Sequence, residues 1–189
     1  MIKIASHAWM MRVVVLGEMI TASGVICLGA VLFVILRKQN ETIALIALEF
    51  YILEVALGAA RLIAAFSLLR VSQEFVTGGQ PAYLLTLGSL AAESMESAYK
   101  LLMFPFCLGA ILFYYLLYKA RTVPRVLSLW GLIAVLPVFL GTLLAIFGYQ
   151  PSWFLYLPYI PFEFTIGVWI LVKGINTSAV MESVPSPGA

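Results

Sequence analysis

The sequence predicts an all-α integral membrane protein, a helical bundle with five transmembrane helices. Of its 189 residues, 63% are hydrophobic and only 11% are charged, whereas a soluble domain carries about 25% charged residues. Five apolar stretches are each long enough to cross a hydrocarbon core, which takes about 20 helical residues. We therefore expect the chain to lie in a lipid bilayer. The net charge of +2 gives no indication of a nucleic-acid partner.

The first two spans are expected at about 13–36 and 42–69, after an N-terminal segment over 1–12. Arg37 and the polar residues that follow it end the first span. The second span is longer than a straight crossing needs, so we expect it to tilt or to protrude at one end. The first span is too long for the apolar region of a signal peptide, and Glu18 interrupts it early.

The third span is expected at about 94–118, after an amphipathic stretch over 82–100. Polar side chains recur in this stretch at steps of three and four, which places them on one helical face: Thr86, Ser89, Glu93, Glu96 or Ser97, and Lys100. The stretch could lie on the membrane surface as a separate helix or continue directly into the third span. No helix-breaking residue separates Lys100 from Leu101, which favours one continuous helix.

The last two spans are expected at about 126–147 and 153–173. Together the five spans form a transmembrane domain over 13–174. The residues that follow, 175–189, include Pro185 and Pro187. This composition is typical of a disordered tail.

The distribution of lysine and arginine favours an external N-terminus and a cytoplasmic C-terminus, because cytoplasmic loops carry the excess of basic residues. The larger set of basic residues lies on the same side of the membrane as the C-terminus: Arg37, Lys38, Lys119, Arg121, Arg125 and Lys173. The other side holds Lys3, Arg12 and Arg70. The expected location is a bacterial inner membrane.

Ionisable residues within or beside the spans are the candidate ligand-binding residues: Glu18, Glu54, Arg61, Glu96, Lys100 and Glu163. A charged side chain at the bilayer centre costs about 3 kcal/mol even on a lenient scale, so such residues usually face a partner or a water-filled cavity. At about 1.5 Å per helical residue, all six fall between mid-membrane and the outer surface. With Glu93, the group holds more acids than bases, an excess that protons or a bound cation must compensate.

Glu54 and Glu163 are the strongest candidates because they lie deepest and in the most apolar surroundings. Glu54 and Arg61 share a helical face two turns apart, so both could line one groove. Glu96 and Lys100 have the i, i+4 order that suits an ion pair. For Lys100 and Arg61 a structural role is favoured, and Glu18 fits either role.

Three segments carry a resemblance to a known family. They are Phe50–Ala56 (FYILEVA), Leu116–Leu127 (LLYKARTVPRVL) and the stretch over 161–174, which contains PFEF, GVW and LVKG. Together they resemble a bacterial multi-pass membrane family catalogued as domain of unknown function 4386. The resemblance implies one further N-terminal helix in most members, which agrees with five spans and an external N-terminus here. It supports Glu54 and Glu163 as positions of interest and implies no reaction.

The expected function is the binding of a proton, a cation or a small polar ligand in an acidic cavity in the outer half of the membrane. Such binding would fit a role in transport, for which a chain of this size would act as a homo-oligomer. The alternative is an accessory or scaffold subunit of a membrane complex, whose charges pair with another protein. An intramembrane enzyme ranks third, because no nucleophile–base constellation is visible. No cofactor is expected, since phosphate-loop and dinucleotide motifs do not occur. A histidine-based metal centre is not expected either, since His7 is the only histidine.

Overall fold

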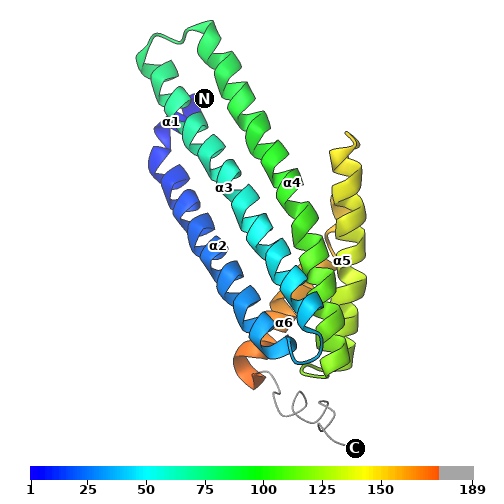
Figure 1. Cartoon of the computed structure of the whole chain (residues 1–189). Coiled ribbons are helices and arrows are strands. Elements are labelled where there is room, and N and C mark those ends of the chain that lie inside the picture. The colour runs from blue at the N-terminus through cyan, green and yellow to red at the C-terminus, as the bar shows by residue number, and fades with distance from the viewer. Residues whose placement is uncertain (175–189) are drawn as a thin grey trace, which may run out of the picture.

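The computed structural model describes residues 1–174, and the tail predicted over 175–189 lies outside the described residues. Within residues 1–174, all regular structure is helical. The elements in order are α1 (Ile2–Ser6), α2 (Ala8–Leu36), α3 (Glu41–Thr77), α4 (Ala82–Ala120), α5 (Arg125–Ile146), the 3-10 turn η1 (Trp153–Leu155) and α6 (Tyr159–Lys173). The predicted all-α helical bundle is confirmed (Figure 1).

Four helices, α2 to α5, are long and apolar enough to cross a membrane, and the chain is therefore a membrane protein. The fifth predicted span corresponds to η1 and α6. With 15 residues, α6 is about 22 Å long, which is shorter than a hydrocarbon core of about 30 Å. Prolines explain the short helix: Pro158 has no backbone N–H to donate, and the helix begins only after it, at Tyr159.

α4 is one uninterrupted helix through Lys100, so the amphipathic stretch and the third predicted span form a single element. α3 and α4 contain 37 and 39 residues. At about 1.5 Å per residue each is about 55–60 Å long, nearly twice a hydrocarbon core. The hairpin that they form extends beyond α5 at the end where the N-terminus lies (Figure 1).

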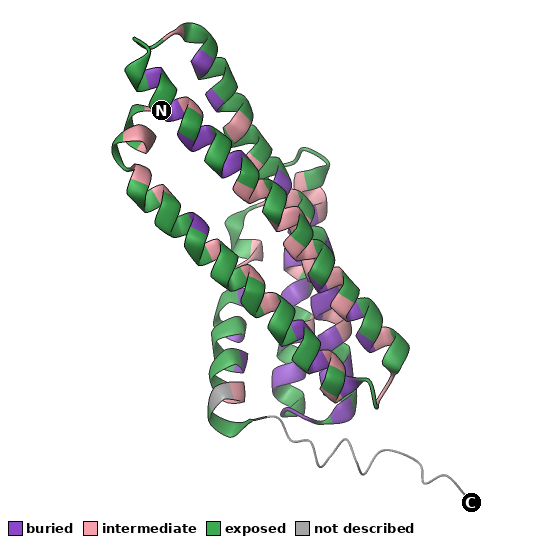
Figure 2. Cartoon of the chain, turned by 60° about the vertical axis from the view of Figure 1, so that its left-hand side comes forward, coloured by how far each residue is buried: buried purple, intermediate pink, exposed green. Residues whose placement is uncertain are grey.

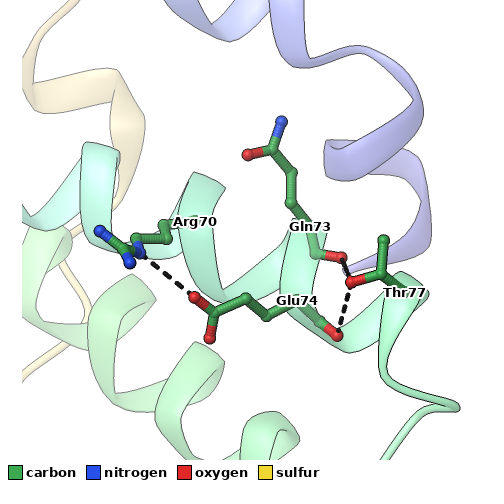
Figure 3. A network of polar contacts seen from close by, with 4 residues as sticks. All are labelled: Arg70, Gln73, Glu74 and Thr77. Atoms are coloured by element: carbon green, nitrogen blue, oxygen red, sulfur yellow. Dashed lines mark hydrogen bonds and ion pairs between the residues drawn. The ribbon is translucent and has the colours of Figure 1, made fainter.

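The end of α3 in this hairpin is polar. Arg70 Nε donates a hydrogen bond to Glu74 Oε1 over 3.2 Å, and Thr77 Oγ1 donates to the carbonyl oxygens of Gln73 and Glu74 over 3.1 and 3.3 Å (Figure 3). The Arg70 and Glu74 side chains are 82% and 54% exposed, so this ion pair contributes little stability in water. The polarity of this end agrees with a hairpin tip outside the hydrocarbon core.

The helices pack in chain order. α3 lies between α2 and α4, α5 packs on α4, and α6 packs on α5. α3 and α4 pack closely at Gly109, where an added Cβ would lie 2.6 Å from Tyr51 Cδ1 and 3.2 Å from the Ala47 carbonyl oxygen. The largest fully buried side chains, Phe113 and Phe162, lie in the half of the bundle that α5 and α6 cover. The outer faces of the long helices are largely exposed (Figure 2) and carry apolar side chains that suit contact with lipid.

Candidate functional site

Arg61 joins three helices. Its Nη1 donates a hydrogen bond of 2.5 Å to Glu18 Oε1, which links α3 to α2. Its guanidinium lies over the ring of Tyr99 on α4, with Cζ 5.6 Å from the ring centroid. The Arg61 and Glu18 side chains are 30% and 32% exposed. Because the two charges neutralise each other, this arrangement lets both residues lie in an apolar bundle.

Glu96 and Lys100 form the ion pair that their spacing predicts, over 2.7 Å on α4. Their side chains are 67% and 37% exposed, and neither residue lines a cavity with the other predicted site residues. The structure therefore separates this pair from Glu18, Glu54 and Glu163.

Glu54 and Glu163 line one cavity of about 360 Å³ between α2, α3, α4 and α6. Glu54 comes from α3 and Glu163 from α6, so the folded bundle joins two segments that are far apart in the chain. Aromatic side chains form much of the remaining wall: Tyr51, Phe106, Tyr114 and Tyr159. We call this the tyrosine cavity.

Glu54 has an unsatisfied carboxylate oxygen. Its Oε2 is buried and has no hydrogen-bond partner among residues 1–174. No lysine or arginine of the described residues lines the tyrosine cavity. Glu163, by contrast, is exposed and marks the side on which the cavity opens. An isolated buried carboxylate is costly, and no side chain among residues 1–174 compensates Glu54 Oε2.

The tyrosines of the cavity are held in fixed positions. The hydroxyl groups of Tyr114 and Tyr159 share a hydrogen bond of 2.8 Å, and one donates while the other accepts. The accepting hydroxyl keeps its own proton available for a further acceptor. Edge-to-face contacts fix the rings, with the Tyr114 and Phe162 centroids 5.0 Å apart and those of Tyr51 and Phe113 5.1 Å apart. The cavity is thus an ordered aromatic site with two carboxylates.

A second hollow, of about 390 Å³, lies beside the Glu18–Arg61 ion pair between α2 and α3. We call it the ion-pair groove. Glu54 and Val25 line both this groove and the tyrosine cavity. Glu54 therefore stands between the ion pair and the tyrosines.

The six predicted site residues do not share one cavity. At about 1.5 Å per residue, Arg61 lies about 30 Å along α3 from Glu41, and Glu54 only about 20 Å. Tyr114 lies about 9 Å from the end of α4 at Ala120, which places the tyrosine cavity toward the α2–α3 and α4–α5 turns. Glu54 and Arg61 do line one groove, as their shared helical face predicts, but α6 brings Glu163 to Glu54 in the separate tyrosine cavity.

Sequence reasoning missed the tyrosines of the site. Two of them had a usable signal, since Tyr51 precedes Glu54 by three residues and Tyr159 precedes Glu163 by four, and these spacings put each pair on one helical face. Tyr114 had no such signal, because it reaches the cavity only through the packing of α4 against the other helices. Among the described residues, no group of three or more histidine, cysteine or acidic side chains could hold a metal ion.

Comparisons with known proteins agree with the resemblance noted in the sequence. No curated protein and no solved structure matches the chain. A family model described as a domain of unknown function, DUF4386, matches residues 1–174. This match covers all three segments that carried the resemblance, which is thereby confirmed. The chain therefore belongs to the DUF4386 family.

Proposed function

We propose that the chain binds a small organic cation in the tyrosine cavity, with Glu54 and Glu163 as its carboxylate partners. The observation that carries the proposal is Glu54 Oε2, a buried oxygen that has no hydrogen-bond partner, in a cavity that no base lines, among the residues that the structure describes. Tyrosine faces attract cations, and quaternary ammonium groups are typical ligands of such aromatic sites. The volume of about 360 Å³ falls within the range of small-molecule sites, about 300–1,000 Å³. A proton on Glu54 is the competing occupant.

The proposed setting is a bacterial inner membrane, with the N-terminus outside and the C-terminus in the cytoplasm. Its support is the larger set of basic residues at the α2–α3 turn, the α4–α5 turn and the end of α6, since cytoplasmic connections carry the excess of lysine and arginine. A ligand site between membrane-crossing helices would suit a role in transport.

Thermal unfolding of the purified protein in detergent tests the proposal. Tetramethylammonium chloride at ten times its dissociation constant should stabilise the wild type by about 1.4 kcal/mol. In a chain of this size that corresponds to a rise in melting temperature of about 3–6 °C. Glu54→Gln should abolish the rise, because the amide removes the negative charge and keeps the shape.

Glu93→Gln is the matched control, because Glu93 lies exposed on α4 and lines neither hollow. This variant should respond to tetramethylammonium as the wild type does, and sodium chloride at equal ionic strength should give no rise. A rise that persists in Glu54→Gln would contradict the proposal. If tetramethylammonium does not raise the melting temperature of the wild type, and Glu54→Gln but not Glu93→Gln changes the pH dependence of unfolding, the occupant of the site is a proton.

The exposure of Glu163 favours a second candidate function, that of a subunit in a larger membrane assembly. Glu163 is an exposed carboxylate and the one acid on α6, and a helix of a partner or of a second copy could cover it. Mild solubilisation from the native membrane should then yield a stoichiometric partner or a homo-oligomer. Repeated isolation of this chain as a monomer would count against this candidate.

A further inference from the structure

A basic pocket of about 620 Å³ lies where the α4–α5 turn meets the C-terminal end of α6. Arg121, Arg125 and Lys173 line it, and no carboxylate does among the described residues. None of the three forms an ion pair with an acid of residues 1–174. A concave site with three cations and no counter-charge is suited to an anion.

Local structure fixes the basic residues around this pocket. Arg121 ends α4 in the left-handed conformation, with φ of 53°, and so turns the chain toward α5. Arg125 is the first residue of α5, and its guanidinium lies over the ring of Tyr118 with Cζ 5.6 Å from the centroid. α5 begins without a side-chain cap, so the partial positive charge of its first turn adds to that of the side chains.

Thr122 provides an independent indication of a ligand. It lines the basic pocket and is only 3% exposed. Its Oγ1 is buried and has no hydrogen-bond partner among the described residues. A buried hydroxyl without a partner is costly, and an anionic oxygen bound in the pocket would accept its hydrogen bond.

An apolar groove of about 420 Å³ runs along α6 and adjoins the basic pocket. Phe164, Val168 and Val172 line it, and it shares Trp169 and Lys173 with the pocket. A cationic site therefore continues directly into an apolar channel on the outside of the bundle. This combination matches an anionic phospholipid, which joins a phosphate to an acyl chain.

We propose that the basic pocket binds the phosphate of an anionic phospholipid, and that one of its acyl chains lies in the apolar groove along α6. Arg121, Arg125 and Lys173 neutralise the phosphate, and Thr122 donates a hydrogen bond to one of its oxygens. The site is separate from the tyrosine cavity, and its occupant stabilises the contact between α6 and the α4–α5 turn.

The test titrates the purified full chain in detergent with phosphatidylglycerol and follows the melting temperature. Phosphatidylglycerol should raise it, whereas phosphatidylcholine, which has no net charge, and inorganic phosphate should not. Arg121→Gly and Lys173→Gln should each raise the half-saturating mole fraction of phosphatidylglycerol about fivefold. Arg121→Gly suits the test because glycine adopts the left-handed conformation freely, so the loss of the guanidinium does not disturb the turn.

Lys119→Gln is the matched control, because it removes one positive charge close to the pocket from a residue that does not line it. It should leave the half-saturating mole fraction unchanged. Val168→Trp should fill the apolar groove and weaken the lipid effect, and Glu54→Gln should not alter it. The proposal would be overturned if phosphatidylglycerol did not raise the melting temperature. It would also be overturned if Lys119→Gln and Lys173→Gln increased the half-saturating mole fraction equally. An equal rise with inorganic phosphate would overturn the lipid assignment in favour of a free anion.

Discussion

At the scale of single residues, the bundle accommodates its internal charges in two ways. Glu18 and Arg61 neutralise each other across α2 and α3, whereas Glu54 forms no ion pair with any lysine or arginine of residues 1–174. The sequence identified all three as unusual because each interrupts an apolar span. It could not show that Arg61 pairs with Glu18, since these residues are 43 positions apart and meet only through helix packing.

Arg61→Met is expected to lower the free energy of unfolding by about 1–3 kcal/mol, because it leaves the Glu18 carboxylate unpaired in an apolar bundle. The double variant Glu18→Gln/Arg61→Met should recover part of this loss, since no unpaired charge remains. Thermal unfolding in detergent measures both effects. Lys100→Met, which breaks the more exposed pair with Glu96, should change the stability by no more than about 1 kcal/mol.

Gly167→Leu offers a test of the tyrosine cavity that leaves its carboxylates intact. Gly167 lines the cavity, and an added Cβ would meet no atom within 4 Å. The leucine side chain should therefore enter the empty space without strain and displace a bound cation. The variant should unfold at or above the wild-type temperature and lose its response to tetramethylammonium. A full response in this stable variant would place the ligand elsewhere.

At the scale of elements, the four long helices followed from their apolar stretches, and the continuity of α4 followed from the lack of a breaker between Lys100 and Leu101. The length of α6 could not be predicted from hydropathy. Hydropathy includes residues 153–158 in the span, whereas α6 begins only at Tyr159, after Pro158. The basic pocket was also missed. Arg121, Arg125 and Lys173 were counted only as markers of orientation, and their convergence depends on how α6 packs beside the α4–α5 turn.

The close packing of α3 on α4 can be tested at a single glycine. Gly109→Ala should destabilise the protein by about 1–3 kcal/mol, because the new Cβ would contact Tyr51 at 2.6 Å and the Ala47 carbonyl oxygen at 3.2 Å. Gly24→Ala is the control, since an added Cβ there meets no atom within 4 Å. The control should be neutral or more stable by up to about 1 kcal/mol, the difference in helix propensity. Equal melting temperatures in the two variants would refute the close contact.

At the scale of the whole molecule, the fold class was predictable because a chain with 63% hydrophobic residues lies in a bilayer, where few folds satisfy the backbone. The grouping of the charges was not predictable. Residue spacing gives distances along one helix, whereas the two hollows depend on how α2, α3, α4 and α6 pack against one another.

Cysteine labelling of intact cells tests the proposed orientation. Cys27 and Cys107 are free cysteines and are first replaced by serine and alanine. A cysteine introduced by Ser152→Cys should then react with a membrane-impermeant maleimide from outside, whereas one introduced by Lys38→Cys should react only after permeabilisation. Both residues are exposed, so a lack of labelling cannot come from burial in the bundle. The opposite pattern would reverse the orientation.

The cation site is tested most directly by calorimetric titration of tetramethylammonium into the wild type and into Glu54→Gln, in the same detergent and at constant ionic strength. The wild type should show saturable binding of one tetramethylammonium per chain, and Glu54→Gln should show none while it keeps the wild-type fold. Equal affinities in the two proteins would contradict a site built around Glu54.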